Sequence, residues 1–159
     1  MGEAVDHSFS RMSSADLKAM VVFLRSVPPV GSSEAAVRPS PASASHRDGA
    51  TANAPGKKVF EGACVSCHGW TGESTVSPFA TLTGSAAVND SSATNVAQIV
   101  VGGTKRLTPD GVLSMPSFGH AYSDNEVAAV ANYVTSRFGA KGSSLTARDV
   151  ANLRAQVSD

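Results

Sequence analysis

The sequence predicts an all-α protein that forms one domain of ordinary size, or a small domain with appendages. Three observations lead to this prediction. Apolar residues recur at the three- and four-residue spacing of a helix, capping signals stand before these stretches, and no alternating apolar–polar run of strand length is recognised. The chain has 159 residues, of which 42% are hydrophobic, enough to build a core.

Residues 1–27 are predicted to form one loop and one helix. Ser13 and Asp16 resemble a capping box with Asp in place of the usual Glu, and the two prolines at 28–29 end the helix. The helix has no obvious partner in its own segment, so we expect it to dock on the following domain or to stay partly exposed. Its apolar stripe consists of Ala19, Met20, Phe23, Leu24 and Val27.

Residues 28–54 have the composition of a linker. Eighteen of these 27 residues are Pro, Gly, Ser or Ala, and large apolar side chains are almost absent. Such a stretch cannot bury enough apolar surface to fold, so we expect a disordered linker in which His46 is solvated.

Residues 55–140 are predicted to form the folded domain. Pro55 suits the first turn of a helix, where its missing N–H group costs nothing. A polar, loop-like stretch at 71–93 leads to a short helix at 96–101, which the glycines at 102–103 end. The first helix of the domain presents one apolar face, made of Val59, Phe60, Ala63 and Cys64.

The last two helices each follow a capping signal. Ser123 and Glu126 form a capping box for a helix over 126–138, which Gly139 ends. Thr146 and Asp149 open a short helix in a C-terminal tail over 141–159. We interpret this tail as a docking element, with a peripheral membrane contact as an alternative. The inward face of the 126–138 helix is made of Val127, Val130, Ala131 and Val134, and that of the tail helix of Val150, Leu153 and Val157.

Charge and hydropathy exclude several classes of protein. Thirteen basic and thirteen acidic residues cancel, which removes the electrostatic case for nucleic acid or an anionic membrane as a partner. The apolar run at 20–24 is far too short for a bilayer span. The N-terminus also lacks the basic region and apolar run of a signal peptide, so we expect the true start to lie upstream or the gene to be truncated.

The two cysteines carry the strongest signal. Cys64, Cys67 and His68 form the pattern C-x-x-C-H, which is typical of covalent c-type haem attachment. Two thiols at this spacing add to the two vinyl groups of one haem, and the adjacent imidazole is aimed at the iron. A zinc site would need further ligands at a matching spacing, and a thioredoxin-like dithiol would need a βαβ pattern. We therefore expect one covalent haem c.

The sixth iron ligand is predicted to be Met115. It lies 47 residues after His68, and Pro116 makes the backbone beside it extended and stiff. A thioether ligand closes the iron and raises its potential, which favours electron transfer, whereas an open iron binds small ligands. His120 is a rival ligand, while Met12 and Met20 lie upstream in another unit. Trp70 is interpreted as packing beside the cofactor.

Residues 55–140 resemble a class I cytochrome c domain. The sequence GKKVF at 56–60 leads into the haem motif, and MP at 115–116 precedes a terminal helix. In that family the first and last helices cross, with a glycine and an aromatic residue meeting another aromatic residue; the matching positions are Gly56, Phe60 and Tyr133. The resemblance also implies that Pro78 offers its carbonyl to His68.

A narrower resemblance covers nearly the whole chain. It is to the last domain of the tri-haem cytochrome subunits of membrane-bound alcohol, gluconate and related dehydrogenases. Met1 would then match an axial methionine of the preceding domain, although two of the three C-x-x-C-H motifs of that family are missing here. The segments that carry the resemblance are MPSFG at 115–119, YSDNEVAAVANYV at 122–134, LTARDVANLR at 145–154, MGEAV at 1–5 and LKAMVVFLRSVP at 17–28.

These resemblances imply an electron-transfer protein rather than an enzyme. Cys64 and Cys67 would anchor the haem, and His68 and Met115 would ligate its iron. Electrons would come from a periplasmic dehydrogenase subunit, pass between haem domains, and continue to ubiquinone or a terminal oxidase. The location would be the periplasm, with association with the outer face of the inner membrane as an option. A free periplasmic carrier, and a ligand-binding or peroxidatic haem protein with an open sixth site, stay open as alternatives.

Overall fold

The computed structural model describes residues 8–28, 53–108 and 111–157. The chain divides into two compact units, residues 1–38 with 105–113 and residues 39–104 with 114–159, and each is described by itself. Most of the predicted linker, namely residues 29–52 with His46, lies outside the described residues, as do Met1 and the side chain of Val157.

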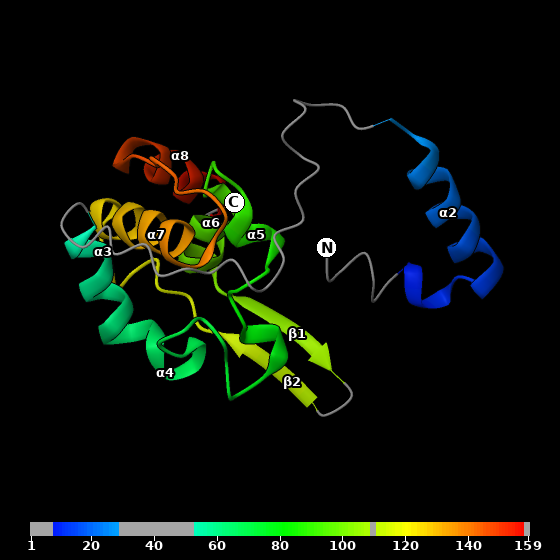
Figure 1. The fold of residues 1–159 in the computed structure, drawn as a ribbon, viewed down its shortest axis with the longest axis horizontal. Helices are drawn as coiled ribbons and strands as arrows, with labels where there is room; N and C mark the ends of the chain where they lie inside the picture. Colours follow the sequence, from blue (N-terminus) through cyan, green and yellow to red (C-terminus); the bar gives the residue numbers. More distant parts are fainter. Residues whose placement is uncertain (1–7, 29–52, 109–110, 158–159) are drawn as a thin grey trace. The chain divides into compact units, whose positions relative to one another are not determined.

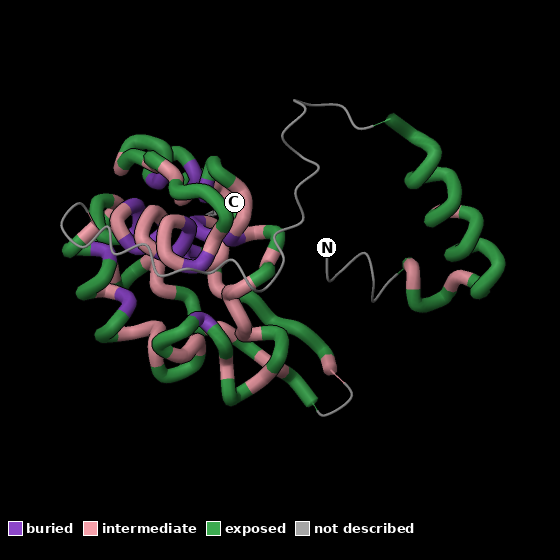
Figure 2. Tube along the Cα trace, in the orientation of Figure 1, coloured by how far each residue is buried: buried purple, intermediate pink, exposed green. Residues whose placement is uncertain are grey.

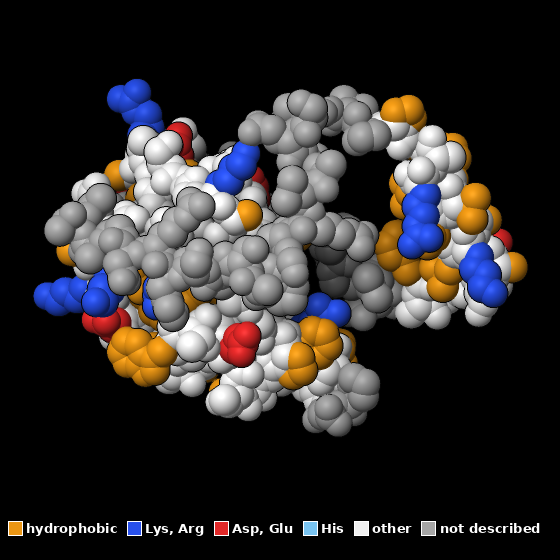
Figure 3. Space-filling view, viewed as in Figure 1, with side chains coloured by type: hydrophobic (Ala, Val, Ile, Leu, Met, Phe, Trp, Pro, Cys, Tyr) orange, Lys and Arg blue, Asp and Glu red, His pale blue; other side chains and the backbone are white. Residues whose placement is uncertain are grey.

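Helix α2 spans Ser14–Ser26 and follows a short 3₁₀ turn over Phe9–Arg11 (Figure 1). The Ser13 side chain accepts a hydrogen bond from the backbone N–H of Asp16 at 3.2 Å, so the predicted cap is confirmed. Figures 2 and 3 show an exposed helix with apolar side chains along its surface. The apolar stripe that the sequence predicts is exposed, with Phe23 and Leu24 about two-thirds accessible.

The second unit begins with one helical stretch in three parts. Helix α3 spans Ala54–Val59, a π-helical turn covers Phe60–Cys64, and helix α4 spans Val65–His68. The stretch ends at Gly69, which adopts φ +70° and donates its N–H to the Val65 carbonyl at 2.8 Å. A side chain at Gly69 would lie 2.3 Å from the Glu73 carbonyl oxygen, so glycine is required there. The glycine thereby turns the chain directly after the C-x-x-C-H motif.

The stretch between His68 and the next long helix is more ordered than we predicted. A 3₁₀ turn covers Pro78–Ala80 and a short helix α5 spans Ala86–Asn89, within the region expected to be a loop. Helix α6 spans Thr94–Gly102, two residues longer at its start than predicted. Its buried residues Ala97 and Val101 face the core.

Helices α7 and α8 complete the domain. Helix α7 spans Asp124–Phe138 and begins with the predicted capping box between Ser123 and Glu126. Helix α8 spans Ala147–Val157 and packs against α6 and α7. Figure 1 shows α3 crossing α7 and α8 lying alongside it, and Figure 2 shows the buried residues concentrated there. The described core comprises Phe60, Val88, Ala93, Val96, Ala97, Val100, Val101, Val127, Ala128, Val130, Ala131, Val134, Phe138, Val150 and Leu153.

A two-stranded hairpin corrects the expectation of a fold without strands. Strand β1 spans Thr104–Thr108 and pairs with β2, Gly111–Met115. Each strand has five residues and most of them are exposed. Only the last three residues of β2 alternate between half-buried and exposed, which is too short a run to mark a strand in the sequence. The Asp-Gly pair at 110–111 is a hairpin turn signal that could have indicated it.

None of the described helices has both the length and the apolar character that a membrane span requires.

Candidate functional site

The two cysteines lie at the junction of the π-helical turn and α4. The Cys64 side chain is half-buried against the hydrophobic core, whereas Cys67 is exposed. Burial first, and then the charge of Cys67, raise the pKa of the Cys64 thiol to about 11. Both thiols are free, and one helical turn separates them. Two unpaired sulfurs are therefore presented from one short segment.

His68 is oriented by a backbone carbonyl. Its Nδ1 lies 2.6 Å from the carbonyl oxygen of Ala80, in the 3₁₀ turn. Because a carbonyl only accepts, Nδ1 carries the proton and the lone pair is left on Nε2, the form that a metal requires. The predicted partner, the Pro78 carbonyl, is wrong: it accepts instead from the backbone N–H of Thr81 at 3.3 Å.

The segment after the motif folds back onto it through side-chain and backbone bonds. Ser74 Oγ donates to the carbonyl of Cys67 at 2.6 Å, which satisfies a terminal carbonyl of α4. The Leu82 N–H donates to the Gly72 carbonyl at 2.7 Å, which closes the loop that carries Ala80. The sequence analysis missed these contacts because they join positions in a stretch without periodicity.

Met115 is the last residue of β2 and is half-buried against the core. It stands where the hairpin ends and a loop begins. Gly103, at φ +68°, lies against this point: a Cβ there would be 2.7 Å from the Met115 carbonyl oxygen. The Met115 backbone therefore depends on a glycine at position 103.

The predicted helix crossing is confirmed. A Cβ at Gly56 would lie 2.1 Å from the Ala129 carbonyl oxygen, so α3 and α7 approach as closely as a glycine permits. The Phe60 ring lies 5.5 Å from the Tyr133 ring and 5.3 Å from the Phe138 ring, centroid to centroid. Phe60 is buried, so the crossing is packed by aromatic contacts beneath the C-x-x-C-H segment.

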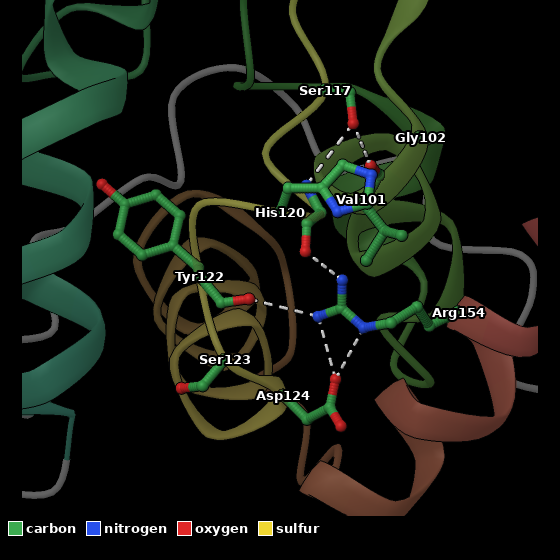
Figure 4. Close-up of a pocket in the computed structure, with 9 residues that line it drawn as sticks. Val101, Gly102, Ser117, His120, Tyr122, Ser123, Asp124 and Arg154 are labelled. Carbon is green, nitrogen blue, oxygen red and sulfur yellow. Dashed lines mark hydrogen bonds and ion pairs between the residues drawn. The ribbon is translucent and has the colours of Figure 1, made fainter.

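The other residues considered from the sequence lie outside this arrangement or at its rim. Trp70 is 64% exposed in the polypeptide, and its packing beside the cofactor stays a prediction. His120 is exposed and lines an open cavity of about 630 Å³ between α6, α7 and α8, which Cys64 and His68 do not line (Figure 4). Among the described residues, no three His, Cys, Asp or Glu side chains lie together as a metal site.

The residues present fit a covalently bound haem. Two free thiols, an imidazole whose Nδ1 is already bonded, and a half-buried thioether are side chains suited to holding iron in a porphyrin. Exposed Val76 and Phe79, in the segment that supplies the Ala80 carbonyl, add apolar surface that suits contact with a hydrophobic ring.

Comparison with known proteins adds a family and several relatives. Residues 53–137, just over half of the chain, match the family described as Cytochrome c. The chain is 29% identical over 98% of its length to a fructose dehydrogenase cytochrome subunit from Gluconobacter japonicus, of which it covers 36%. It is 29% identical over 97% of its length to the cytochrome c subunit of a quinone alcohol dehydrogenase from Gluconacetobacter polyoxogenes, of which it covers 34%.

A third relative is the gluconate 2-dehydrogenase cytochrome c subunit of Pantoea cypripedii, at 26% identity over 97% of this chain and 36% of that protein. The chain thus spans about a third of the length of the curated relatives it matches. These matches extend over nearly the whole chain, well beyond the family match at 53–137.

Proposed function

Since the chain belongs to the cytochrome c family, we propose that it carries one covalently attached haem c and transfers electrons. The haem supplies a one-electron iron couple. In this proposal the chain binds and orients the cofactor, keeps water from one side of it, and catalyses no bond change of its own.

Each site residue has a separate role in this proposal. Cys64 and Cys67 would hold the haem as thioethers, and His68, through Nε2, and Met115, through its sulfur, would bind its iron. The observation that carries the proposal is the 2.6 Å contact between His68 Nδ1 and the Ala80 carbonyl. It orients the ring and leaves the nitrogen that an iron needs, directly after two free thiols.

The proposed partner is a periplasmic dehydrogenase subunit. Support comes from relatives that are cytochrome subunits of fructose, alcohol and gluconate dehydrogenases. Electrons would pass from that partner, directly or through further haem domains, toward ubiquinone or a terminal oxidase. A formal net charge of +0 favours transfer within a complex over electrostatic capture of a diffusing, highly charged partner.

The first experiment is spectroscopic. The chain is expressed with an export signal and the haem maturation machinery, and haem is stained on a denaturing gel. We expect covalent haem, a low-spin spectrum and the charge-transfer band of a methionine–iron bond in the oxidised protein. A protein without covalent haem would contradict the roles of Cys64 and Cys67.

Replacing Met115 by alanine tests the sixth ligand. We expect Met115→Ala to lose the charge-transfer band, and its reduced form to bind carbon monoxide readily, while the wild type resists carbon monoxide. Met12→Ala is the matched control, because Met12 lies just before α2 in the first unit. It should behave as the wild type. Equal carbon monoxide binding by the wild type and Met115→Ala would favour the open-iron, ligand-binding alternative.

A further inference from the structure

We propose that Arg154, on the C-terminal helix α8, is a positioning residue for the sixth iron ligand. Its guanidinium fastens the loop that follows Met115, so that α8 controls how firmly the methionine is presented. The proposal rests on the proposed role of Met115 as a ligand, and it gives helix α8 a role at the haem site.

The loop at 116–122 is fixed on one side by the end of α6. Phe118 N–H donates to the Val100 carbonyl at 2.9 Å, and Gly119 N–H donates to the Val101 carbonyl at 3.2 Å. Ser117 Oγ also donates to the Val101 carbonyl, at 2.6 Å. These bonds use two N–H groups and one hydroxyl of the loop, and they leave the carbonyl groups of Gly119 and Tyr122 for another partner.

Arg154 binds both of these carbonyl groups, as Figure 4 shows. Its Nη1 donates to the Gly119 carbonyl and its Nη2 to the Tyr122 carbonyl at 3.2 Å. Its Nε donates to Asp124 Oδ1 at 2.9 Å, and Nη2 lies 2.9 Å from the same oxygen. One planar side chain therefore joins two loop carbonyls to the first residue of α7.

The position of Arg154 is itself fixed by packing. Its neighbour Leu153 is buried and Val150 is fully buried, so α8 is held in the core of its own domain. Thr146 and Asp149 cap the helix through reciprocal hydrogen bonds of 2.9 Å and 3.3 Å. Val150 and Leu153, from the apolar face that the sequence suggested for docking, are thus used internally, and they make α8 a rigid support for the guanidinium.

The packing at Gly119 indicates that the arrangement is specific. A Cβ at this position would lie 2.8 Å from the Val101 carbonyl oxygen and 3.3 Å from Nη1 of Arg154. Only a glycine lets α6 and the arginine approach the loop from both sides. The arginine side chain is 28% exposed and its partner Asp124 is 35% exposed, so the interaction is partly protected from water.

Loosening this loop should weaken the methionine–iron bond. Met115 lies four residues before Gly119 and is joined to it by a short stretch that begins with a stiff proline. When the carbonyl bonds are lost, the loop gains conformations in which the sulfur leaves the iron. An external ligand binds only those molecules in which the methionine has left the iron. Its apparent affinity therefore rises as the population of such molecules increases.

The test is an imidazole titration of the oxidised, haem-loaded protein at neutral pH. We expect Arg154→Gln to bind imidazole about tenfold more tightly than the wild type, the scale of a lost charge-assisted hydrogen bond. Its charge-transfer band should also weaken. Arg154→Lys keeps the positive charge but lacks the planar fork, so its imidazole affinity should lie between those of the wild type and Arg154→Gln. It replaces Arg154→Gln in the test if that variant does not fold.

Arg148→Gln is the matched control, since it removes the same charge from an exposed position on the same helix. It should bind imidazole as the wild type does. Equal imidazole affinities in the Arg154 and Arg148 variants, with the band intact in both, would overturn the role of Arg154 and leave Met115 as the ligand. A second outcome would overturn the proposed function and this inference together. In it, the wild type lacks the charge-transfer band, and Met115→Ala binds imidazole with the same affinity as the wild type.

Discussion

The crossing of α3 and α7 depends on the absence of a side chain at Gly56, which makes Gly56→Ala a sharp test of the fold. A methyl group there would lie 2.1 Å from the carbonyl oxygen of Ala129, 2.6 Å from its carbonyl carbon and 2.8 Å from the Cβ of Tyr133. None of these atoms can rotate away, because two belong to the backbone and the third is fixed to it. The two helices must therefore move apart.

The expected loss of stability follows from two opposing effects. Overpacking a tight contact costs about 1–3 kcal/mol, and a backbone oxygen as the nearest neighbour puts this case near about 3 kcal/mol. Alanine regains up to about 1 kcal/mol over glycine in a helix. The net loss in the free energy of unfolding is about 2 kcal/mol, which lowers the melting temperature of a domain of this size by about 8–16 °C.

The assay is thermal unfolding of the haem-loaded protein, followed by far-ultraviolet circular dichroism. Gly62→Ala is the control, because Gly62 is exposed in the same helical stretch and a Cβ there meets nothing within 4 Å. We expect the control to match the wild type or to gain up to about 1 kcal/mol. A loss below about 0.5 kcal/mol in Gly56→Ala, the size of an ordinary surface change, would refute the close crossing.

Two further predictions concern Met115 and the start of α7. Gly103→Ala and Gly84→Ala should each cost about 1–2 kcal/mol, since both glycines have positive φ. Only Gly103→Ala should weaken the methionine–iron band in the absorption spectrum, because its Cβ alone would strike the Met115 backbone; equal spectra would contradict this. Hydrogen bonds from the Ser123 side chain and then its backbone lower the pKa of Glu126 below its ordinary 4.5. The stability from this pair is complete above that value and is lost as the pH falls through the lower folded-state pKa. The melting-temperature difference between wild type and Ser123→Ala should therefore narrow in acid, and a difference independent of pH would rule out the pair.

The features that were predicted correctly are local in the chain. A capping box joins Ser123 to Glu126 over three residues, and Asp16 bonds to Ser13 over the same distance. The C-x-x-C-H motif is equally local, since it spans five residues, and the haem attachment that it indicates stays a prediction. The Gly56 and Phe60 contacts with α7 were predicted through the family resemblance, which supplies long-range information that periodicity lacks.

The features that were missed join distant parts of the chain or depend on solvent exposure. The carbonyl that orients His68 belongs to Ala80, and no side-chain pattern marks one backbone carbonyl over its neighbour two residues earlier. The hairpin was missed because its strands are short and mostly exposed, so the period of two extends over no more than three residues.

The sequence alone determines which side chains are candidates for holding a haem, because two thiols, an imidazole and a thioether are defined by residue type and spacing. How firmly those groups are held is a tertiary property. Arg154 contacts Asp124 and the Gly119 carbonyl across 30 and 35 residues, and Gly56 meets Ala129 across the helix crossing. Such contacts arise only when the buried face of each helix finds the core, which sets the register of the helices and brings distant backbone groups within hydrogen-bonding distance.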